Sequence, residues 1–464
     1  MKKNLSLAHC MDIPLAGCTG SNYPETSGGG SSSECMQQSD VMSVLKEAYI
    51  YAFPLVLMDA TKTVSVNTER PGNGKAPINQ FLHGDNTADA EFKTVVTPNV
   101  DTVYSQVWLD LSVEPLIFTM PDTDRFFNVQ LLDAWTNTAD VLTKPGFYAI
   151  TSPVWNGILP QEVTRINIPT DMAWFIGRCI LKNRYDIENV TEIQNKMSLV
   201  PLSAYISEKE YKAPEGTYKK ENDYIPVDKV FSMGFEEFFT KANELMIQNP
   251  PSKEDKDILK KISAVNVGPG LKFDKKILGA DVPLLWSDFI KGLKDELIRK
   301  GSKFSVKMGQ WSYFGRPIGD FGTEYDYRAM IALGGLGANT LDVALYAKTN
   351  TDDTGERMSG KHTYRIHFSS VPPVLEKGFW SVTAYGSDDF LIDNHLKRYC
   401  INDRSYYAIN DDGTFDITVS ANEPENVSNW LPVNEDEFHL YMRIYYPDMD
   451  RINKWTAPVI TVKE

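Results

Sequence analysis

The spacing of apolar side chains divides the chain into regions that begin at about residue 38. From Val41 to Val56 apolar residues recur every three or four positions, which predicts a helix. Pro54 should kink or end this helix, because proline has no backbone N–H to donate to the helical ladder. A loop rich in Gly, Pro and Asn follows from Arg70 to Asn79.

From about Val95 the period shortens to two, which is typical of strands with one buried face. Strands are predicted at 103–109, 116–120, 126–132, 146–151 and 172–181. Pro, Asn, Asp or Gly residues separate these segments. Several short strands joined by turns favour a β sandwich or a jelly roll.

Residues 205–300 are rich in Lys and Glu and return to helical spacing. Two apolar stripes carry this pattern: Phe235, Phe238, Phe239, Ala242, Leu245 and Met246, and then Leu284, Leu285, Phe289, Leu293 and Leu297. Both stripes have the spacing that a core-facing helix needs, so core packing is favoured over a ligand site. The region is predicted to be a helical insert between two β regions.

The last third of the chain alternates again. Tyr364–Phe368, Phe379–Tyr385 and Phe438–Tyr445 predict strands. Tyr407–Ile409 and Phe415–Val419 flank an Asn-Asp-Asp-Gly turn, and together they predict a hairpin.

A short internal repeat links the two β regions. Phe126–Leu132 resembles Phe379–Tyr385, since each begins with two aromatic residues and has valine at its fourth position. We therefore predict a mainly β fold with a helical insert, built from two tandem β jelly-roll or sandwich domains plus a helical segment. The predicted parts are a signal-like segment and flexible linker (1–38), an N-terminal helix and jelly-roll domain (39–204), a helical insert or linker (205–340) and a C-terminal jelly-roll domain (341–464).

Charge and cysteine usage narrow the function classes. The chain has 47 Lys and Arg against 62 Asp and Glu, a net charge of −15, which argues against a broad nucleic-acid surface. Only Cys179 and Cys400 belong to the predicted folded body, so a disulfide scaffold is excluded. No apolar run approaches the roughly 18 residues that a membrane span needs.

The N-terminus resembles a processing signal. Lys2 and Lys3 give a positive start, and Leu15-Ala16-Gly17-Cys18 resembles a bacterial lipobox, in which the cysteine is acylated and becomes the mature N-terminus. The Gly/Ser stretch Ser27–Ser33 would then act as a flexible tether. This predicts a cell-envelope protein, lipid-anchored at Cys18 or else periplasmic or secreted. The alternative is a disordered tail with a chance match, since His9, Asp12 and Pro14 interrupt the apolar stretch.

Two longer motifs resemble known families. Thr97–Ser105 resembles the Asn-x-Asp-Thr-x-Tyr-Ser signature of the "domain of unknown function 1254" family, and Arg125–Asp133 is similar to its central strand. The C-terminal part resembles the "domain of unknown function 1214" family in Gly378–Tyr385, Asn394, Arg398-Tyr399, Asp412-Gly413, Asn429–Pro432 and Arg443–Pro447. The resemblance covers nearly all of residues 40–450. It implies a pair of jelly rolls with helices between them and a homo-oligomer, with a trimer as one option, but no established reaction.

One departure concerns the C-terminal family. After the Trp-Ser strand that family is expected to carry Leu-Tyr-Asp, whereas this chain has Ala384-Tyr385-Gly386. A role for that first acid is therefore in doubt here.

Asn99, Asp101 and Tyr104 form the first candidate site. Strand alternation would place Asn99 and Asp101 on one face and Tyr104 on the other. A carboxylate beside amide and phenol groups can bind a sugar or act as an acid or base. The alternative is a turn held by hydrogen bonds from side chains to the backbone.

The second candidate site uses aromatic and cationic residues of the C-terminal part. Its predicted ligand contacts are Trp380, Asn394, Arg398, Tyr399 and Trp430, to which Asn128 of the N-terminal central strand is added. Arg398 could hold a carboxylate or phosphate through two hydrogen bonds, and an exposed Trp could stack on a sugar ring. The alternative is a buried Arg surrounded by core aromatics.

No cofactor and no metal site are predicted. His362 and His367 differ by five positions, so they face opposite sides of one strand. Asn350–Gly355 resembles a calcium loop, but Lys361 stands where an EF-hand needs glutamate. A calcium site built from carboxylates and carbonyls stays open. Nucleophile-elbow and dinucleotide motifs are absent.

These patterns support three functional hypotheses. The leading one is an exported or envelope-associated protein that binds a small polar or sugar-like ligand between its two β domains. The second is a hydrolase-like or lyase-like enzyme that uses Asp101 with Tyr104 or Arg398. The third is a structural oligomer without a small-molecule site. In all three no nucleic acid is expected as a partner, and membrane contact comes only from an N-terminal lipid.

The lipobox hypothesis predicts a modified N-terminus. Protein extracted from native membranes should begin at an acylated Cys18, and Cys18→Ala should move it from the detergent phase to the aqueous phase. Mass spectrometry of the N-terminal peptide checks this, with Cys10→Ala as the control. An unmodified N-terminus upstream of Cys18 would contradict the prediction.

Overall fold

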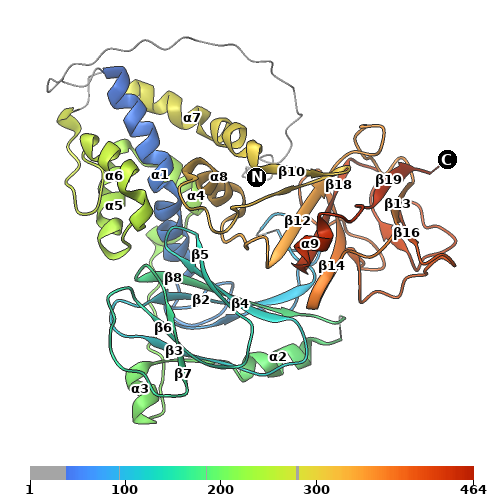
Figure 1. Ribbon diagram of the computed structural model, residues 1–464, viewed down its shortest axis with the longest axis horizontal. Coiled ribbons are helices and arrows are strands. Elements are labelled where there is room, and N and C mark those ends of the chain that lie inside the picture. The colour runs from blue at the N-terminus through green and yellow to red at the C-terminus, as the bar shows by residue number, and fades with distance from the viewer. Residues whose placement is uncertain (1–37, 94, 184, 278–281, 464) are drawn as a thin grey trace.

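A computed structural model describes residues 38–463 apart from 94, 184 and 278–281, so Cys18 and the signal-like segment lie outside the described residues. Two β sandwiches lie side by side, and a group of helices covers one end of the N-terminal sandwich (Figure 1). The chain passes from the first sandwich through most of the helices to the second sandwich.

Helix α1 (Gln38–Ser65) forms the centre of the helical group and contacts α4, α5, α6, α7 and α8. The bounds of these helices are Pro226–Ser232 for α4, Phe235–Gln248 for α5, Lys256–Ile262 for α6, Val282–Gly301 for α7 and Tyr325–Gly335 for α8. The Tyr49 ring of α1 stacks on Phe238 of α5 with centroids 4.0 Å apart. The predicted stripe of α5 is buried at Phe238, Phe239, Ala242 and Met246, as expected for core packing.

Pro54 was expected to kink or end this helix, and because it lies inside α1 the second alternative is wrong. Residues around it, from Ala48 to Met58, are almost completely buried, and this packing outweighs the hydrogen bond that proline removes. By length and composition α1 could also cross a membrane, which the sequence reading missed. However, 78% of its apolar window is buried inside the protein, as in a core helix.

The N-terminal sandwich has one sheet of order β1-β2-β8-β4-β5 and a second of order β7-β6-β3-β9. The strands are β1 (Leu82–His83), β2 (Thr102–Asp110), β3 (Leu116–Met120), β4 (Phe127–Asp133), β5 (Thr138–Leu142), β6 (Gly146–Thr151), β7 (Val163–Asn167), β8 (Met172–Ile180) and β9 (Ser198–Pro201). Helices α2 (Ile187–Asn195) and α3 (Leu202–Ser207) flank it. Val107, Phe118 and Phe175 belong to the core between its sheets.

The C-terminal sandwich has sheets of order β10-β11-β12-β18-β14-β15 and β17-β16-β13-β19. The strands are β10 (Ser305–Met308), β11 (Trp311–Phe314), β12 (Ala344–Thr349), β13 (Tyr364–Phe368), β14 (Val374–Gly386), β15 (Cys400–Asn402), β16 (Phe415–Ser420), β17 (Trp430–Pro432), β18 (Phe438–Pro447) and β19 (Val459–Val462), with α9 (Met449–Ile452) between the last two. Ile366, Val382 and Met442 belong to its core.

The same strand pattern occurs twice. Strands β2–β9 and β12–β19 have the same order and the same partners, including the parallel pairs β6–β7 and β16–β17. The pairings align Arg178 with Arg443 and Tyr104 with Tyr346. A matching backbone hydrogen bond of 2.9 Å, Leu181 to Asp101 and Tyr446 to Val343, occurs in each half. The predicted internal repeat is therefore confirmed at the level of topology.

The mainly β fold with helices is confirmed, and each β region is a sandwich of two sheets. Jelly-roll connectivity is not confirmed. The predicted hairpin is only half present: Asn410 donates to Thr414 O across the turn at 2.7 Å, but Tyr407–Ile409 is not a strand. The Tyr407 ring instead packs on Phe415, with centroids 4.7 Å apart.

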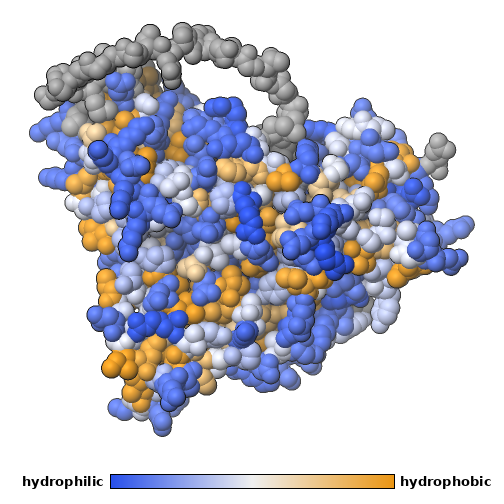
Figure 2. All heavy atoms as spheres, viewed as in Figure 1, coloured by the Kyte–Doolittle hydropathy of each residue, from blue (hydrophilic) through white to orange (hydrophobic). Residues whose placement is uncertain are grey.

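The molecular surface seen in Figure 2 is mostly hydrophilic, in keeping with the many charged residues. Apolar side chains gather on this face at the lower left, near α3. Exposed apolar residues of the N-terminal sandwich include Phe147, Val154, Ile158 and Ile206.

Candidate functional site

Asp101 lies at the junction of the two sandwiches. It precedes β2, and its side chain is fully buried against the C-terminal sheet. Ser381 Oγ donates to one carboxylate oxygen at 2.5 Å, and the Arg404 guanidinium donates to the other at 2.6 Å. Asn402 Nδ2 adds a longer contact of 3.4 Å. A carboxylate from one sandwich is thus neutralised by groups from the other.

Asn99 holds the turn before β2 and also crosses the junction. Its Oδ1 accepts the backbone N–H of Asp101 at 2.7 Å, the Asx-type turn that the sequence offered as an alternative. Its Nδ2 lies 3.2 Å from the Tyr104 hydroxyl and 2.8 Å from the Tyr445 hydroxyl. Asn99, which belongs to the signature segment, therefore contacts a tyrosine of each sandwich.

Arg404 lies between two carboxylates. Besides Asp101 it contacts the Asp403 carboxylate at 2.5 Å, and its guanidinium lies over the Phe379 ring, 4.9 Å from the centroid. Burial raises the pKa of Asp403 to about 6, because desolvation and the nearby Asp101 charge outweigh the attraction of Arg404. Sequence reasoning missed Asp403 and Arg404, which lie outside the quoted motifs.

Arg178 and Arg443 occupy equivalent positions in the two sandwiches. Arg178 donates to Gln130 Oε1 at 3.0 Å, and Arg443 donates to the Tyr385 hydroxyl at 2.8 Å. Burial alone would raise the pKa of Tyr104, but the Arg178 charge lowers it below the ordinary value. The junction therefore contains two buried arginines, each held by polar groups.

The structure keeps Arg398 of the second candidate site apart from Asp101 and Tyr104 of the first. Arg398 Nη1 donates to the carbonyls of Val427 at 2.5 Å and Trp430 at 3.0 Å. Asn394 accepts the backbone N–H of Arg398 at 3.0 Å. Among the described residues no hydrogen bond or ion pair joins Arg398 to Asp101 or Tyr104.

The two predicted tryptophans are almost fully buried. Trp380 is 2% exposed and packs against Phe368 and Phe415 in the core of the C-terminal sandwich. Trp430, also 2% exposed, donates its Nε1–H to Ser420 O at 3.1 Å. Neither ring is available for stacking in this conformation, and their ligand-binding role stays a prediction.

Asn128 and Tyr399 carry buried polar atoms without a hydrogen bond within the described part of the chain. Both amide atoms of Asn128 are in this state, although the residue is completely buried. Asn128 is aligned with Ser381 by the repeat, and Ser381 does have a partner, Asp101. At this one pair of equivalent positions, Ser381 has a hydrogen-bond partner and Asn128 has none among the described residues.

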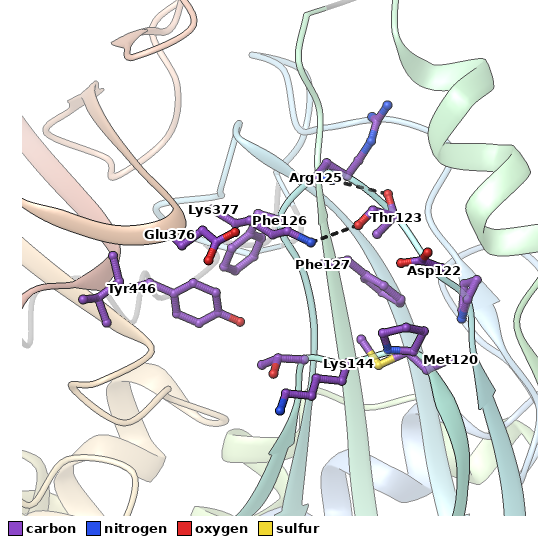
Figure 3. Close-up of a pocket in the computed structure, with 14 residues that line it drawn as sticks. Met120, Asp122, Thr123, Arg125, Phe126, Phe127, Lys144, Glu376, Lys377 and Tyr446 are labelled. Atoms are coloured by element: carbon purple, nitrogen blue, oxygen red, sulfur yellow. Dashed lines mark hydrogen bonds between the residues drawn. The ribbon is translucent and has the colours of Figure 1, made fainter. Parts of the chain in front are cut away.

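A pocket of about 400 Å³ opens between the sandwiches near this junction (Figure 3). It is lined by Met120, Pro121, Asp122, Thr123, Arg125, Phe126, Phe127, Thr143, Lys144, Pro145, Leu375, Glu376, Lys377 and Tyr446. Lys377 Nζ donates to Thr123 O at 3.0 Å, so the two sandwiches are also linked at its edge. Burial raises the pKa of Tyr446 to about 12, which keeps its hydroxyl protonated.

Two residues of the pocket wall have strained backbones. Lys377 has φ +61° and Tyr446 has φ +48°, a left-handed conformation that non-glycine residues seldom adopt. Lys377 lies in a register shift of β14 between Val374 and Phe379. Such strain often accompanies binding sites, because the fold must hold the residue against its preference.

No group of three or more His, Cys, Asp or Glu is placed to hold a metal within residues 38–463, leaving out the gaps given above.

Residues 78–201 match the model described as "Protein of unknown function (DUF1254)", and residues 343–449 match "Protein of unknown function (DUF1214)". The chain carries both domains, in this order. The first domain contains Asp101 and the second contains Ser381 and Arg404, so the central ion pair joins the two. No curated protein matches the chain.

Two solved structures are similar. The VPA0106 protein from Vibrio parahaemolyticus is 24% identical, with a TM-score of 0.68, over 91% of this chain and 100% of that chain. An uncharacterized protein from Burkholderia cenocepacia is 10% identical, with a TM-score of 0.43, over 92% of this chain and 95% of that chain. The first of these shows a shared fold.

Replacing Asp101 tests the strength of the junction. Asp101→Asn should lower the free energy of unfolding by about 3 kcal/mol, because it removes the buried charge that faces Arg404. Denaturant titration of purified protein checks this, with Asp124→Asn on the exposed surface as the control. Equal unfolding midpoints for Asp101→Asn and the wild type would contradict it.

Asp403 should make stability depend on pH. Its pKa of about 6 in the folded state lies above the ordinary value of 3.8, so the folded state binds this proton more tightly. The stabilisation is complete below about pH 4 and is lost as the pH rises through about 6. Asp403→Asn should remove this decline. Melting temperatures from pH 4 to 8 measure it, and parallel curves for both proteins would show that Asp403 does not titrate in this range.

Proposed function

We propose that this protein binds a small polar, sugar-like ligand in the pocket between its two sandwiches. The observation that carries the proposal is the pocket itself, since both sandwiches supply its walls. Its volume of about 400 Å³ lies within the usual range for small-molecule sites. A site at a domain junction is also where such pockets commonly occur.

The chemistry of the walls supports a ligand with several oxygen atoms. In Figure 3 the Tyr446 hydroxyl and the ammonium groups of Lys144 and Lys377 lie around the open space. Phe126 and Phe127 provide apolar surface on another side. Hydrogen-bond donors beside aromatic carbons suit the hydroxyl and carboxylate groups of sugars and sugar acids, which have polar rims and apolar ring faces.

The Asp101 ion pair supports the same proposal in a different role. Asp101 and Asn99 are occupied by protein groups, so they serve to fix one sandwich against the other. This constraint keeps the Tyr446 side of the pocket at a set distance from the Lys144 side. We include a cell-envelope location in the proposal, on the basis of the lipobox-like Cys18, so that the ligand would come from outside the cytoplasm.

A pocket-filling variant tests the proposal. Thr143 is exposed on the pocket wall, so Thr143→Trp should block the pocket without disturbing the core. The probes are glucose, galactose, glucuronate and galacturonate, read as shifts in melting temperature. At least one should stabilise the wild type by the mass-action effect of binding.

The matched control is Val154→Trp, which adds the same ring to an exposed site of the same sandwich outside the pocket. The control should keep the wild-type response, and Thr143→Trp should lose it. No shift with any probe, or an equal shift in Thr143→Trp, would contradict the proposal.

A further inference from the structure

A buried amide lies directly behind the wall of the pocket. Residues of β4 point alternately into the core of the N-terminal sandwich, where Phe127 and Val129 pack, and into the junction, where Phe126 packs against the C-terminal sandwich. Asn128 has the same parity as Phe126, so its side chain faces the junction. The residue is completely buried there.

The neighbours of Asn128 on this face belong to the pocket wall. The register of β4 and β5 brings Thr143 opposite Asn128. Phe126, Thr143 and Tyr446 all line the pocket. The Phe126 and Tyr446 rings are in contact, with centroids 4.9 Å apart. Asn128 is therefore close to the pocket but covered by the side chains of its wall.

Several polar atoms at this place lack hydrogen bonds. Within the described part of the chain these are Nδ2 and Oδ1 of Asn128, the Tyr446 hydroxyl, and Nε of Arg178, the cross-strand neighbour of Asn128. Asn128 lowers the pKa of Tyr446 against the larger raising effect of burial, so the two groups lie close together. No hydrogen bond of ordinary geometry joins them, however. A buried amide without hydrogen bonds is costly to the folded state.

The internal repeat shows that this fold does not require an amide here. Ser381 lies beside Arg443 in the C-terminal sheet as Asn128 lies beside Arg178 in the N-terminal sheet. A smaller or an apolar side chain at position 128 would avoid the cost of two unpaired atoms. The unpaired donor and acceptor of Asn128 therefore point to a partner that is not part of the chain.

The hydrogen-bonding pattern of the amide selects the chemical group of that partner. Asn128 offers N–H donors at Nδ2 and an acceptor at Oδ1. A carboxylate only accepts, so it would leave Oδ1 opposite another oxygen. A secondary amide has one N–H and one carbonyl oxygen, so it pairs with both sides of Asn128 at once. The adjacent Phe126 and Tyr446 rings provide apolar surface for the methyl group of an acetamide.

We propose that Asn128 recognises the acetamido group of an N-acetylated amino sugar at the inner end of the pocket. This rests on the proposed function and specifies the class of sugar. The Tyr446 side chain turns aside to admit the acetamido group, whose carbonyl oxygen accepts from Nδ2 and whose N–H donates to Oδ1 of Asn128. The sugar hydroxyls stay in the open part of the pocket, near Lys144 and Lys377.

A comparison of acetylated sugars with their parent hexoses tests this. The probes are N-acetylglucosamine against glucose and N-acetylgalactosamine against galactose. The readout is the melting temperature of the full chain as a function of sugar concentration. At least one acetylated sugar should reach half of its effect at a concentration at least about tenfold lower than its parent, because it pairs buried groups that are otherwise unpaired. Thr143→Trp should lose the response to every sugar.

Substitutions at position 128 separate recognition from folding. Asn128→Leu removes both unpaired atoms at similar side-chain size, so it should raise the melting temperature of the free protein and abolish the preference for the acetylated sugar. Asn128→Ser, which introduces the side chain that the other half has at this place, should also abolish the preference. The matched control is Asn156→Leu, which removes an exposed amide of the same sandwich outside the pocket and should change neither property.

The outcomes distinguish this inference from the proposed function. If hexoses or uronates stabilise the wild type but no acetylated sugar is preferred, only the role of Asn128 is overturned. The same holds if Asn128→Leu keeps the preference, or if it lowers the melting temperature while Asn156→Leu does not, since the amide would then have partners in the free protein. If no sugar of either set stabilises the wild type, the proposed function and this inference fail together.

Discussion

The arrangement of this protein depends on a carboxylate that is buried at a junction between two sandwiches. Asp101 comes from the first sandwich and is fully enclosed, so its charge requires the Arg404 guanidinium and the Ser381 hydroxyl of the second. A buried charge without a partner is very costly, which makes separation of the sandwiches unfavourable. The Phe126 and Phe379 rings, with centroids 5.0 Å apart, add apolar contact beside it. The pocket is lined by residues of both sandwiches, so its walls depend on how the two are held together.

Residues of both family signatures lie at this junction and hold it together. Asn99 and Asp101 lie on the segment that enters the junction, and Ser381 lies on the strand that receives it. A motif rich in Asn, Asp and Tyr suggests a ligand site in the sequence, yet several of its polar atoms are satisfied by the other sandwich. Polar residues that hold two domains together are under the same packing demands as residues that hold a ligand.

The local spacing of apolar residues was sufficient to predict many of the strands and helices. The alternation near Val103 and the spacing around Phe238 located strands and helices, because burial of one face dictates those periods. The continuation of α1 past Pro54 to Ser65 was not predictable in this way, since the burial that stabilises it comes from helices more than 150 residues away. Asp403 and Arg404 were also missed, because a pairing with Asp101 depends on which sheets meet. The pocket likewise requires the packing of segments that are distant in the sequence.

The repeated strand pattern gives this chain a freedom that an assembly of two identical subunits lacks. In such an assembly every contact across the symmetry axis occurs twice. Here Val343 stands where the other half has Asp101, and the loop after β5, with Thr143 and Pro145, stands where the loop after β15 has Arg404. The Asp101–Arg404 ion pair joins the sandwiches at one of these two equivalent places. At the other, Thr143 and Pro145 line the pocket. Because both halves belong to one polypeptide with its own residues at each position, one corner can hold the sandwiches together while the equivalent corner lines a pocket.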